Sequence, residues 1–214
     1  MWTRRTIVDQ RQRGRASHRA HLVHNRPRRA RWQNVAVPPP PTFRAATSDD
    51  VALVVDLVDS AYRGERSKAG WTTEAELLGG QRTDAEEIAA VISSADSRLL
   101  LASDDDGAVI ACCVIQQRRA GRSYFGTFAV RPGLQGGGVG KQVLAEAERV
   151  ARDEWACDTI EMTVIGQRED LIAWYVRRGY VATGEMRPFP YGDDRFGVPR
   201  REDLYFVVLA KSLV

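Results

Sequence analysis

Hydrophobic residues spaced three and four apart predict four helices in this chain. They cover residues 48–62, a stretch that begins at 83, residues 138–153 and residues 168–178. Thr47 with Asp50, and Thr83 with Glu86, have the spacing of capping boxes before the first two helices. Gly179 is placed to end the last helix in a left-handed conformation.

Short apolar or alternating runs predict strands between these helices. They cover residues 42–45, 98–102, 108–117, 124–130, 159–165, 180–186 and 204–209. Residues 63–70 and 188–199 carry polar, Gly and Pro residues and are predicted as loops. The pattern predicts one α+β domain over residues 42–214, with a mixed, mostly antiparallel sheet and helices on both faces.

A glycine-rich turn joins the strand 124–130 to the helix 138–153. The first N–H groups of a helix lack internal partners, and the helix dipole places positive charge there. Glycines let the backbone approach a ligand closely, so a strand, a glycine turn and a helix in this order form a cradle for phosphate. The alternative is an ordinary connection that is rich in glycine.

The spacing within the turn selects among phosphate-binding motifs. A P-loop fails at Gln135 and Gln142, and a dinucleotide fingerprint fails at Lys141. The spacing that fits is Gln-x-x-Gly-x-Gly, formed by Gln135, Gly138 and Gly140. This segment resembles the acyl-CoA pyrophosphate loop of the GNAT superfamily of N-acetyltransferases.

A second segment resembles the same superfamily. Trp174 and Tyr175 lie on the helix 168–178, which ends at Gly179 and Tyr180, in the Tyr-x-x-x-Gly-Phe/Tyr pattern of that superfamily. Many members carry Asn seven residues before the tyrosine, where this chain has Arg168. The resemblance covers residues 42–214.

The resemblance implies acetyl transfer from acetyl-CoA, as co-substrate, to a primary amine of a small molecule by direct attack. It implies a backbone cradle for the pyrophosphate and a strand edge at Val130 that pairs with the pantetheine arm. The implied cofactor-binding residues are Phe128, Ala129, Val130, Gln135, Gly136, Gly137, Gly138, Val139, Gly140, Lys141, Arg168, Tyr175 and Arg177.

Two catalytic residues are expected. Tyr175 is protonated at neutral pH and can protonate the departing thiolate, although its helix face also fits a core aromatic. Glu161 is the candidate general base, because it lies on the strand face opposite Ile160. Glu74 is the alternative base, and either acid could instead be a solvated or ion-paired surface residue.

Charge divides the chain into two parts. Residues 1–41 hold ten arginines and one acid, Asp9, for a net charge of +9, whereas the remainder carries −6. This Arg- and Pro-rich tail has few aliphatic residues and is predicted to be disordered. It could be an arm for nucleic acid, an organelle transit peptide or a segment without function, and we favour the last.

The remaining composition narrows the class of protein. All three histidines lie in the tail, and Cys112, Cys113 and Cys157 lack metal-ligand spacing, so no metal site is expected. Adjacent Cys112 and Cys113 fit small strand residues better than reactive thiols. No secretory signal or membrane span is visible, which predicts a cytoplasmic monomer or homodimer with no membrane partner and no nucleic acid; an Arg-rich targeting segment is the alternative.

Two functions remain open at this stage. The first is an N-acetyltransferase, and the second is a non-catalytic module that binds acyl-CoA or uses the basic arm on nucleic acid. Enzymatic turnover discriminates them. The loop around Trp71 and the loop 188–199, with its Asp193, Asp194 and Arg195, are expected to shape the acceptor pocket.

Overall fold

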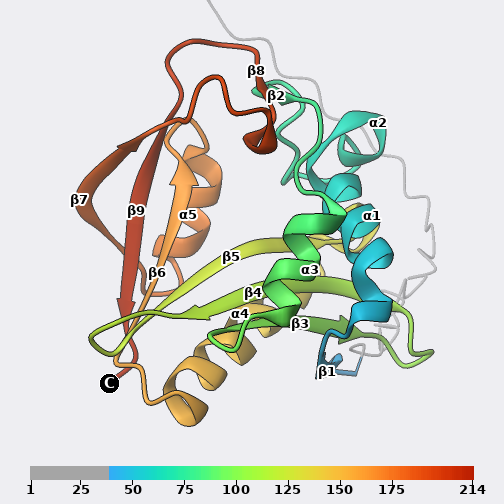
Figure 1. Ribbon diagram of the computed structural model, residues 1–214, viewed down its shortest axis with the longest axis vertical. Helices are drawn as coiled ribbons and strands as arrows, with labels where there is room; N and C mark the ends of the chain where they lie inside the picture. The colour runs from blue at the N-terminus through green and yellow to red at the C-terminus, as the bar shows by residue number, and fades with distance from the viewer. Residues whose placement is uncertain (1–38) are drawn as a thin grey trace, which may run out of the picture. The chain divides into compact units, whose positions relative to one another are not determined.

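A computed structural model describes residues 39–214, so nearly all of the predicted disordered tail lies outside the described residues. Seven strands form one sheet in the order β1-β3-β4-β5-β6-β9-β7 (Figure 1). In this sheet only the β5–β6 pair is parallel, which agrees with the predicted mixed, mostly antiparallel sheet. The strands are β1 (Thr42–Ala45), β3 (Ser97–Ser103), β4 (Val109–Gln117), β5 (Arg122–Val130), β6 (Thr159–Ile165), β7 (Val181–Pro188) and β9 (Tyr205–Ser212).

Helices cover both faces of this sheet. On one face lie α1 (Val51–Tyr62), which follows a short 3₁₀ turn at Ser48–Asp50, and α3 (Ala85–Ser93). On the other lie α4 (Val139–Arg149), continued by a π-helical turn at Val150–Glu154, and α5 (Glu169–Val176). No helix within residues 39–214 is long and apolar enough to cross a membrane.

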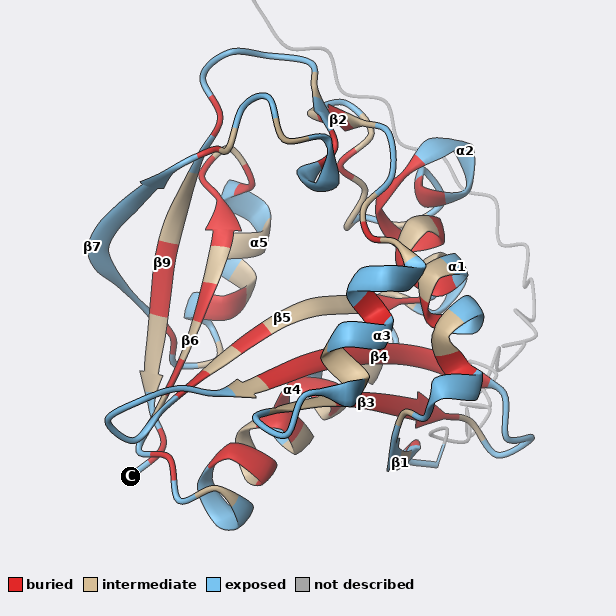
Figure 2. Ribbon diagram, viewed as in Figure 1, coloured by how far each residue is buried: buried red, intermediate tan, exposed pale blue. Residues whose placement is uncertain are grey.

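The central strands are buried on both faces, which is why they are continuous apolar runs. In β4, Cys112 and Val114 pack toward α1 and α3, whereas Cys113 and Ile115 pack toward α4. Figure 2 shows β3 and β4 buried through most of their length. The cysteines are thus small strand residues, and burial raises the pKa of the Cys112 thiol to about 12, which keeps it unreactive.

Local signals misplaced one helix start and missed short elements. The capping residue of α3 is Asp84, whose carboxylate accepts from Glu87 N–H at 2.8 Å, so the capping box predicted at Thr83 and Glu86 is wrong by one residue. The segment predicted as a loop after α1 contains α2 (Gly64–Ser67). A second sheet pairs β2 (Leu78–Gly79) with β8 (Val198–Pro199). The sequence pattern missed both strands because contacts between segments distant in sequence stabilise them.

The parallel pair at the sheet's centre opens along its length. Strands β5 and β6 pair only from Arg122 with Thr159 to Tyr124 with Glu161. Beyond Tyr124 they diverge, as Figure 1 shows where β5 and β6 leave their common corner. A bulge in β5 at Thr127, whose φ is +41°, increases the bend. The opening between these strands holds the candidate site.

Candidate active site

The glycine-rich turn after β5 presents unpaired backbone donors. Gly138 precedes α4 with φ +92°, a conformation that glycine adopts without strain. The N–H groups of Lys141 and Gln142 both donate to the Gly138 carbonyl. Within residues 39–214, nothing accepts a hydrogen bond from the five N–H groups of residues 136–140. Five free donors at a helix N-terminus form an anion-binding cradle.

A cavity of about 260 Å³, here named the loop cavity, lies beside these donors. Gly140 gives α4 its close approach, because a Cβ there would come 3.2 Å from Phe128 and 3.6 Å from Trp174. The lining residues named from the sequence are Phe128, Val130, Gln135, Gly136, Gly138, Gly140, Lys141 and Tyr175. Those that the sequence missed in this role are Tyr62, Trp71, Thr72, Leu171, Trp174 and Arg178.

Aromatic side chains form one wall of the loop cavity. Trp174 lies at the centre, with ring centroids 6.4 Å from Trp71, 6.2 Å from Phe128 and 5.0 Å from Tyr175. The Arg178 guanidinium stacks 3.5 Å above the Trp174 ring, and burial lowers the pKa of Arg178. The loop around Trp71, expected at the acceptor pocket, therefore lies at the loop cavity instead.

Two long polar side chains hold the Trp71 loop in place. Gln135 donates from Nε2 to Thr72 Oγ1 at 2.8 Å and to the Val130 carbonyl at 3.0 Å, and accepts from Thr72 N–H at 3.2 Å. Arg168, buried at the start of α5, donates to the Thr72 and Trp71 carbonyls at 3.0 and 3.3 Å. Both residues were expected to contact the cofactor, but in the structure their side chains form hydrogen bonds with this loop.

A second cavity, the cleft cavity, occupies about 250 Å³ of the opening between β5 and β6. Four residues line both cavities and so form the wall between them: Tyr62, Phe128, Leu171 and Tyr175. Phe189 and Phe196, from the loop 188–199, line the cleft cavity as expected of that loop. Asp193 instead binds Arg195, and neither lines this cavity.

Tyr175 lies where the two cavities meet. The residue is 5% exposed, and its hydroxyl has no hydrogen-bond partner within the described part of the chain. Burial, reinforced by the neighbouring Tyr62, raises the pKa of Tyr175 well above 10. This phenol therefore remains protonated at neutral pH and has a proton available for a group in either cavity.

Tyr62 fixes the bulged part of β5 from the opposite helix layer. Its hydroxyl donates to the Phe128 carbonyl, next to the bulge at Thr127. Burial, followed by the charge of Glu74, raises the pKa of Tyr62 to about 12, so this donor is retained over the physiological range. The Phe128 carbonyl is thereby fixed next to two residues that line the loop cavity, Phe128 and Val130.

The cleft cavity holds one nearly buried acid. Glu74 is 7% exposed, and its Oε2 accepts from Arg63 Nη1 at 2.6 Å, with Arg82 Nε at 3.9 Å. Its Oε1 has no hydrogen-bond partner among residues 39–214. Glu74, the alternative base of the sequence analysis, thus has one carboxylate oxygen free beside the cleft cavity.

The structure moves several predicted site residues away from these cavities. Glu161 binds Arg122 at 3.2 Å at the closed end of the β5–β6 pair and lines neither cavity, because the strands diverge only beyond it. Ala129 is buried among α1 and α3. Arg177 is exposed, and the neighbouring Arg178 lines the loop cavity in its place. Gly137 of the turn and Val139, the first residue of α4, do not line the loop cavity.

The sequence profile of the Acetyltransferase (GNAT) family matches residues 57–180, more than half of the chain. This chain belongs to the GNAT acetyltransferase family. The matched region spans the glycine turn, the bulged strand β5 and the helix of Tyr175. No curated protein sequence matches the chain.

Solved structures of other acetyltransferases share this GNAT fold. A chimera of the Vibrio cholerae spermidine N-acetyltransferase SpeG and hSSAT has a TM-score of 0.60 at 14% identity, over 82% of this chain and 96% of its own. A candidate phosphinothricin N-acetyltransferase has 0.60 at 18% identity, over 81% and 99%. An IAA acetyltransferase from Bacillus cereus has 0.54 at 15%, over 80% and 99%. At these identities the likeness is one of fold.

Proposed function

We propose that this GNAT acetyltransferase transfers an acetyl group from acetyl-CoA to a primary amine of a small molecule by direct nucleophilic attack. The observation that carries the proposal is the place of Tyr175, in the wall between a cavity beside free backbone donors and a second cavity with a buried acid. Acyl transfer needs donor, acceptor and proton source to meet at such a junction.

The loop cavity suits the cofactor. The free N–H groups of residues 136–140 would bind the pyrophosphate, with Lys141 beside them. The edge of β5 beyond Tyr124 has no β6 partner and offers amide groups to the pantetheine arm. Arg178, which lines this cavity over Trp174, adds a positive charge.

The cleft cavity suits the acceptor. The amine nitrogen would form a bond to the acetyl carbonyl carbon, and the carbon–sulfur bond would break. Backbone N–H groups near Val130 would stabilise the oxyanion, and Tyr175 would give its proton to the departing sulfur. Glu74 would take the proton of the incoming ammonium, directly or through water.

The acceptor is best sought with a panel of small amines. The protein would be mixed with acetyl-CoA and each amine, and thiol release would be followed. Acetylated product with at least one amine is the expected outcome. Binding of coenzyme A without turnover across a broad panel would favour the non-catalytic alternative.

A further inference from the structure

A third cavity, here named the charged cavity, adjoins the cleft cavity. It has a volume of about 380 Å³ and lies beside the start of α3. The residues that line both cavities are Arg82, Glu87 and Phe196. Charged groups at this shared boundary would therefore contact an acceptor that extends out of the cleft cavity.

Contacts with α1 fix the position of Arg82. Its backbone N–H donates to Asp59 Oδ1 at 2.9 Å, and its guanidinium lies over the Tyr62 ring, 5.5 Å from the ring centroid. Tyr62 belongs to the wall between the cleft cavity and the loop cavity, which also contains Tyr175. The cation is thereby held against a residue of the wall at which the transfer is proposed to occur.

The guanidinium of Arg82 is accessible and has unused donors. Its side chain is 30% exposed, and it donates no hydrogen bond to an acceptor among residues 39–214. Arg168, which also lines the cleft cavity, instead donates to the Trp71 and Thr72 carbonyls. Arg82 therefore has donors available for a ligand in the cleft cavity.

The charge of Arg82 is only partly balanced. Among the described residues, the acid that forms an ion pair with it is Glu74, with 3.9 Å between Nε and Oε2. The same Oε2 accepts from Arg63 at 2.6 Å, so one carboxylate serves two guanidinium groups, and the three side chains together carry one positive charge. Glu87, the second acid of the cleft lining, is exposed and accepts from the Thr83 hydroxyl at 2.8 Å. An anionic ligand would complete the pairing of Arg82.

We propose that the acceptor is an amino acid, whose carboxylate binds Arg82 while its amine faces Glu74. A planar guanidinium with free N–H groups matches the two oxygens of a carboxylate. Because Arg82 and Glu74 approach to 3.9 Å, the carboxylate and the reacting amine must lie close together in the acceptor, as they do in α- and β-amino acids. This inference rests on the function proposed above and narrows its acceptor to one class.

Pairs of acceptors that differ only in the carboxylate test this inference. Each α- or β-amino acid of a panel would be compared with its carboxamide, which has nearly the same size and lacks the charge. For the wild type, kcat/KM of the best amino acid should exceed that of its carboxamide at least about tenfold, because hydrogen bonds between charged groups are strong. The basicity of the amine differs within a pair but is the same for every variant, so the ratio is compared between variants.

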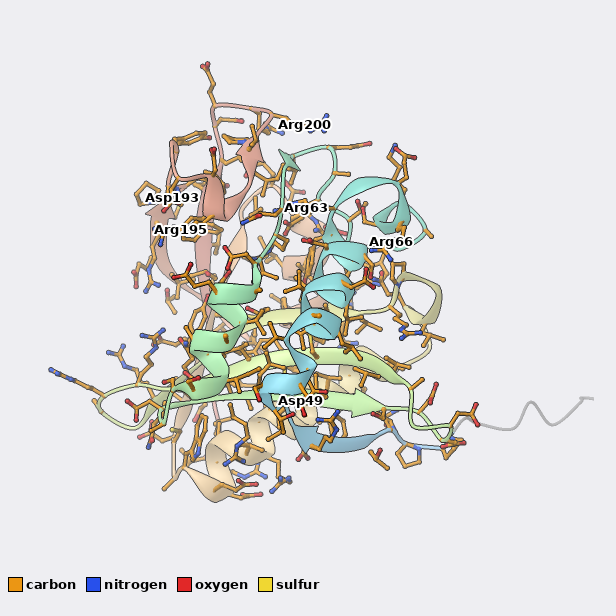
Figure 3. All side chains as sticks on the ribbon, turned by 45° about the vertical axis from the view of Figure 1, so that its right-hand side comes forward. Asp49, Arg63, Arg66, Asp193, Arg195 and Arg200 are labelled. Carbon is orange, nitrogen blue, oxygen red and sulfur yellow. The ribbon has the colours of Figure 1, made fainter. Side chains whose placement is uncertain are left out.

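Arg82→Gln should reduce this ratio at least about tenfold, through a higher KM for the amino acid rather than a lower kcat. Arg82→Lys keeps the charge without the planar fork and should retain part of the ratio. Arg195→Gln is the matched control, because Arg195 lines the charged cavity but binds Asp193 at 2.8 and 2.5 Å, and Figure 3 labels the two side chains beside each other. It should leave the ratio unchanged.

Binding of a carboxylic acid without an amine separates this inference from the proposed transfer. The probe is the deaminated analogue of the best amino acid, or propanoate where no amine is acetylated. Calorimetry on protein saturated with coenzyme A should show saturable binding that Arg82→Gln weakens at least about tenfold. If no amine is acetylated but this binding is observed, the transfer proposal fails and the carboxylate site at Arg82 is supported.

Other outcomes would overturn the inference while the transfer stands. They are equal kcat/KM for amino acids and their carboxamides, equal losses in the Arg82 and Arg195 variants, and the absence of saturable binding of the probe. A preference for diamines would also overturn it, because the acids Asp84 and Glu86 of the charged cavity would then select a second cation on the acceptor.

Discussion

Two side chains that line the cleft cavity have environments suited to proton transfer. Tyr175 combines burial, a raised pKa and a hydroxyl without a partner in the described chain. Glu74 combines burial with one free carboxylate oxygen. These two properties belong to single residues, and single substitutions test them.

Replacing Tyr175 with Phe should lower kcat at least about tenfold, because general acid catalysis contributes on the order of 10²–10⁴. Coenzyme A affinity should remain nearly unchanged, since the ring is retained. The raised pKa also predicts that kcat shows no alkaline decline from this phenol below about pH 10. Steady-state kinetics and calorimetry with both proteins test this, and equal rates would remove Tyr175 from the reaction.

Glu74→Gln should lower kcat/KM for the amine by roughly tenfold or more, because the free oxygen beside the cleft cavity no longer accepts a proton. Glu161→Gln is the control, because that carboxylate binds Arg122 outside both cavities. Thermal melts must accompany the rates, since Glu74 also neutralises buried Arg63. If the Glu161 variant is impaired while the folded Glu74 variant retains its rate, the base has been misassigned.

At the scale of elements, two connections differ in what their polar groups bind. The turn between β5 and α4 leaves the five N–H groups of residues 136–140 unpaired, and three of these residues, Gly136, Gly138 and Gly140, line the loop cavity. The connection between β1 and α1 is closed by an ion pair, in which Arg44 donates to Asp50 at 2.7 and 2.8 Å. The first connection leaves donors free for a ligand, and the second is closed by contacts within the protein.

Gly138→Asp should weaken coenzyme A binding by about tenfold or more, because it places a negative charge where the pyrophosphate is expected. Gly138→Ala carries the same backbone strain at φ +92° without the charge, so it should bind more tightly than the Asp variant. Gly133→Asp serves as a comparison, because it adds the same charge at a position where φ is not in the left-handed region and no atom lies within 4 Å of a Cβ. Identical coenzyme A titrations for the wild type and Gly138→Asp would argue against the cradle.

Asp50→Asn should reduce the free energy of unfolding at pH 7 by about 1–2 kcal/mol. Hydrogen bonds from Arg44, and then from Thr47, hold the pKa of Asp50 well below its usual range. A lowered folded-state pKa stabilises the protein above the unfolded value near 3.9 and loses that effect as pH falls. In urea titrations the difference between wild type and variant should therefore be smaller at about pH 3 than at pH 7, without vanishing, because the folded-state pKa lies lower still. A pH-independent difference would contradict this explanation.

At the scale of the described domain, the strands β5 and β6 diverge and open the sheet. The residues shared by the loop cavity and the cleft cavity form the wall between them. One side of the wall carries the glycine turn and the other the buried acid. Ligands in the loop cavity would contact β5, α4, α5 and the Trp71 loop together. Binding should therefore stabilise the whole domain.

Coenzyme A at about a hundred times its dissociation constant should stabilise the native protein by about 2.7 kcal/mol and raise Tm. At the same concentration the increase should be smaller in Gly138→Asp, because its affinity is expected to be weaker. Differential scanning fluorimetry across a concentration series measures it. An unchanged Tm at all concentrations would exclude tight binding.

The sequence alone determined the α+β class, the order of strand, glycine turn and helix, and the place of Tyr175 on α5. These are local properties: hydrophobic periodicity sets each element's buried faces, and a glycine at φ +92° needs no distant partner. Only the tertiary structure decided that Glu74 rather than Glu161 faces the cleft, and that Arg178 rather than Arg177 lines the loop cavity. The reason is the divergence of β5 and β6, together with contacts such as Gln135 with Thr72 across 63 positions, which no local pattern encodes.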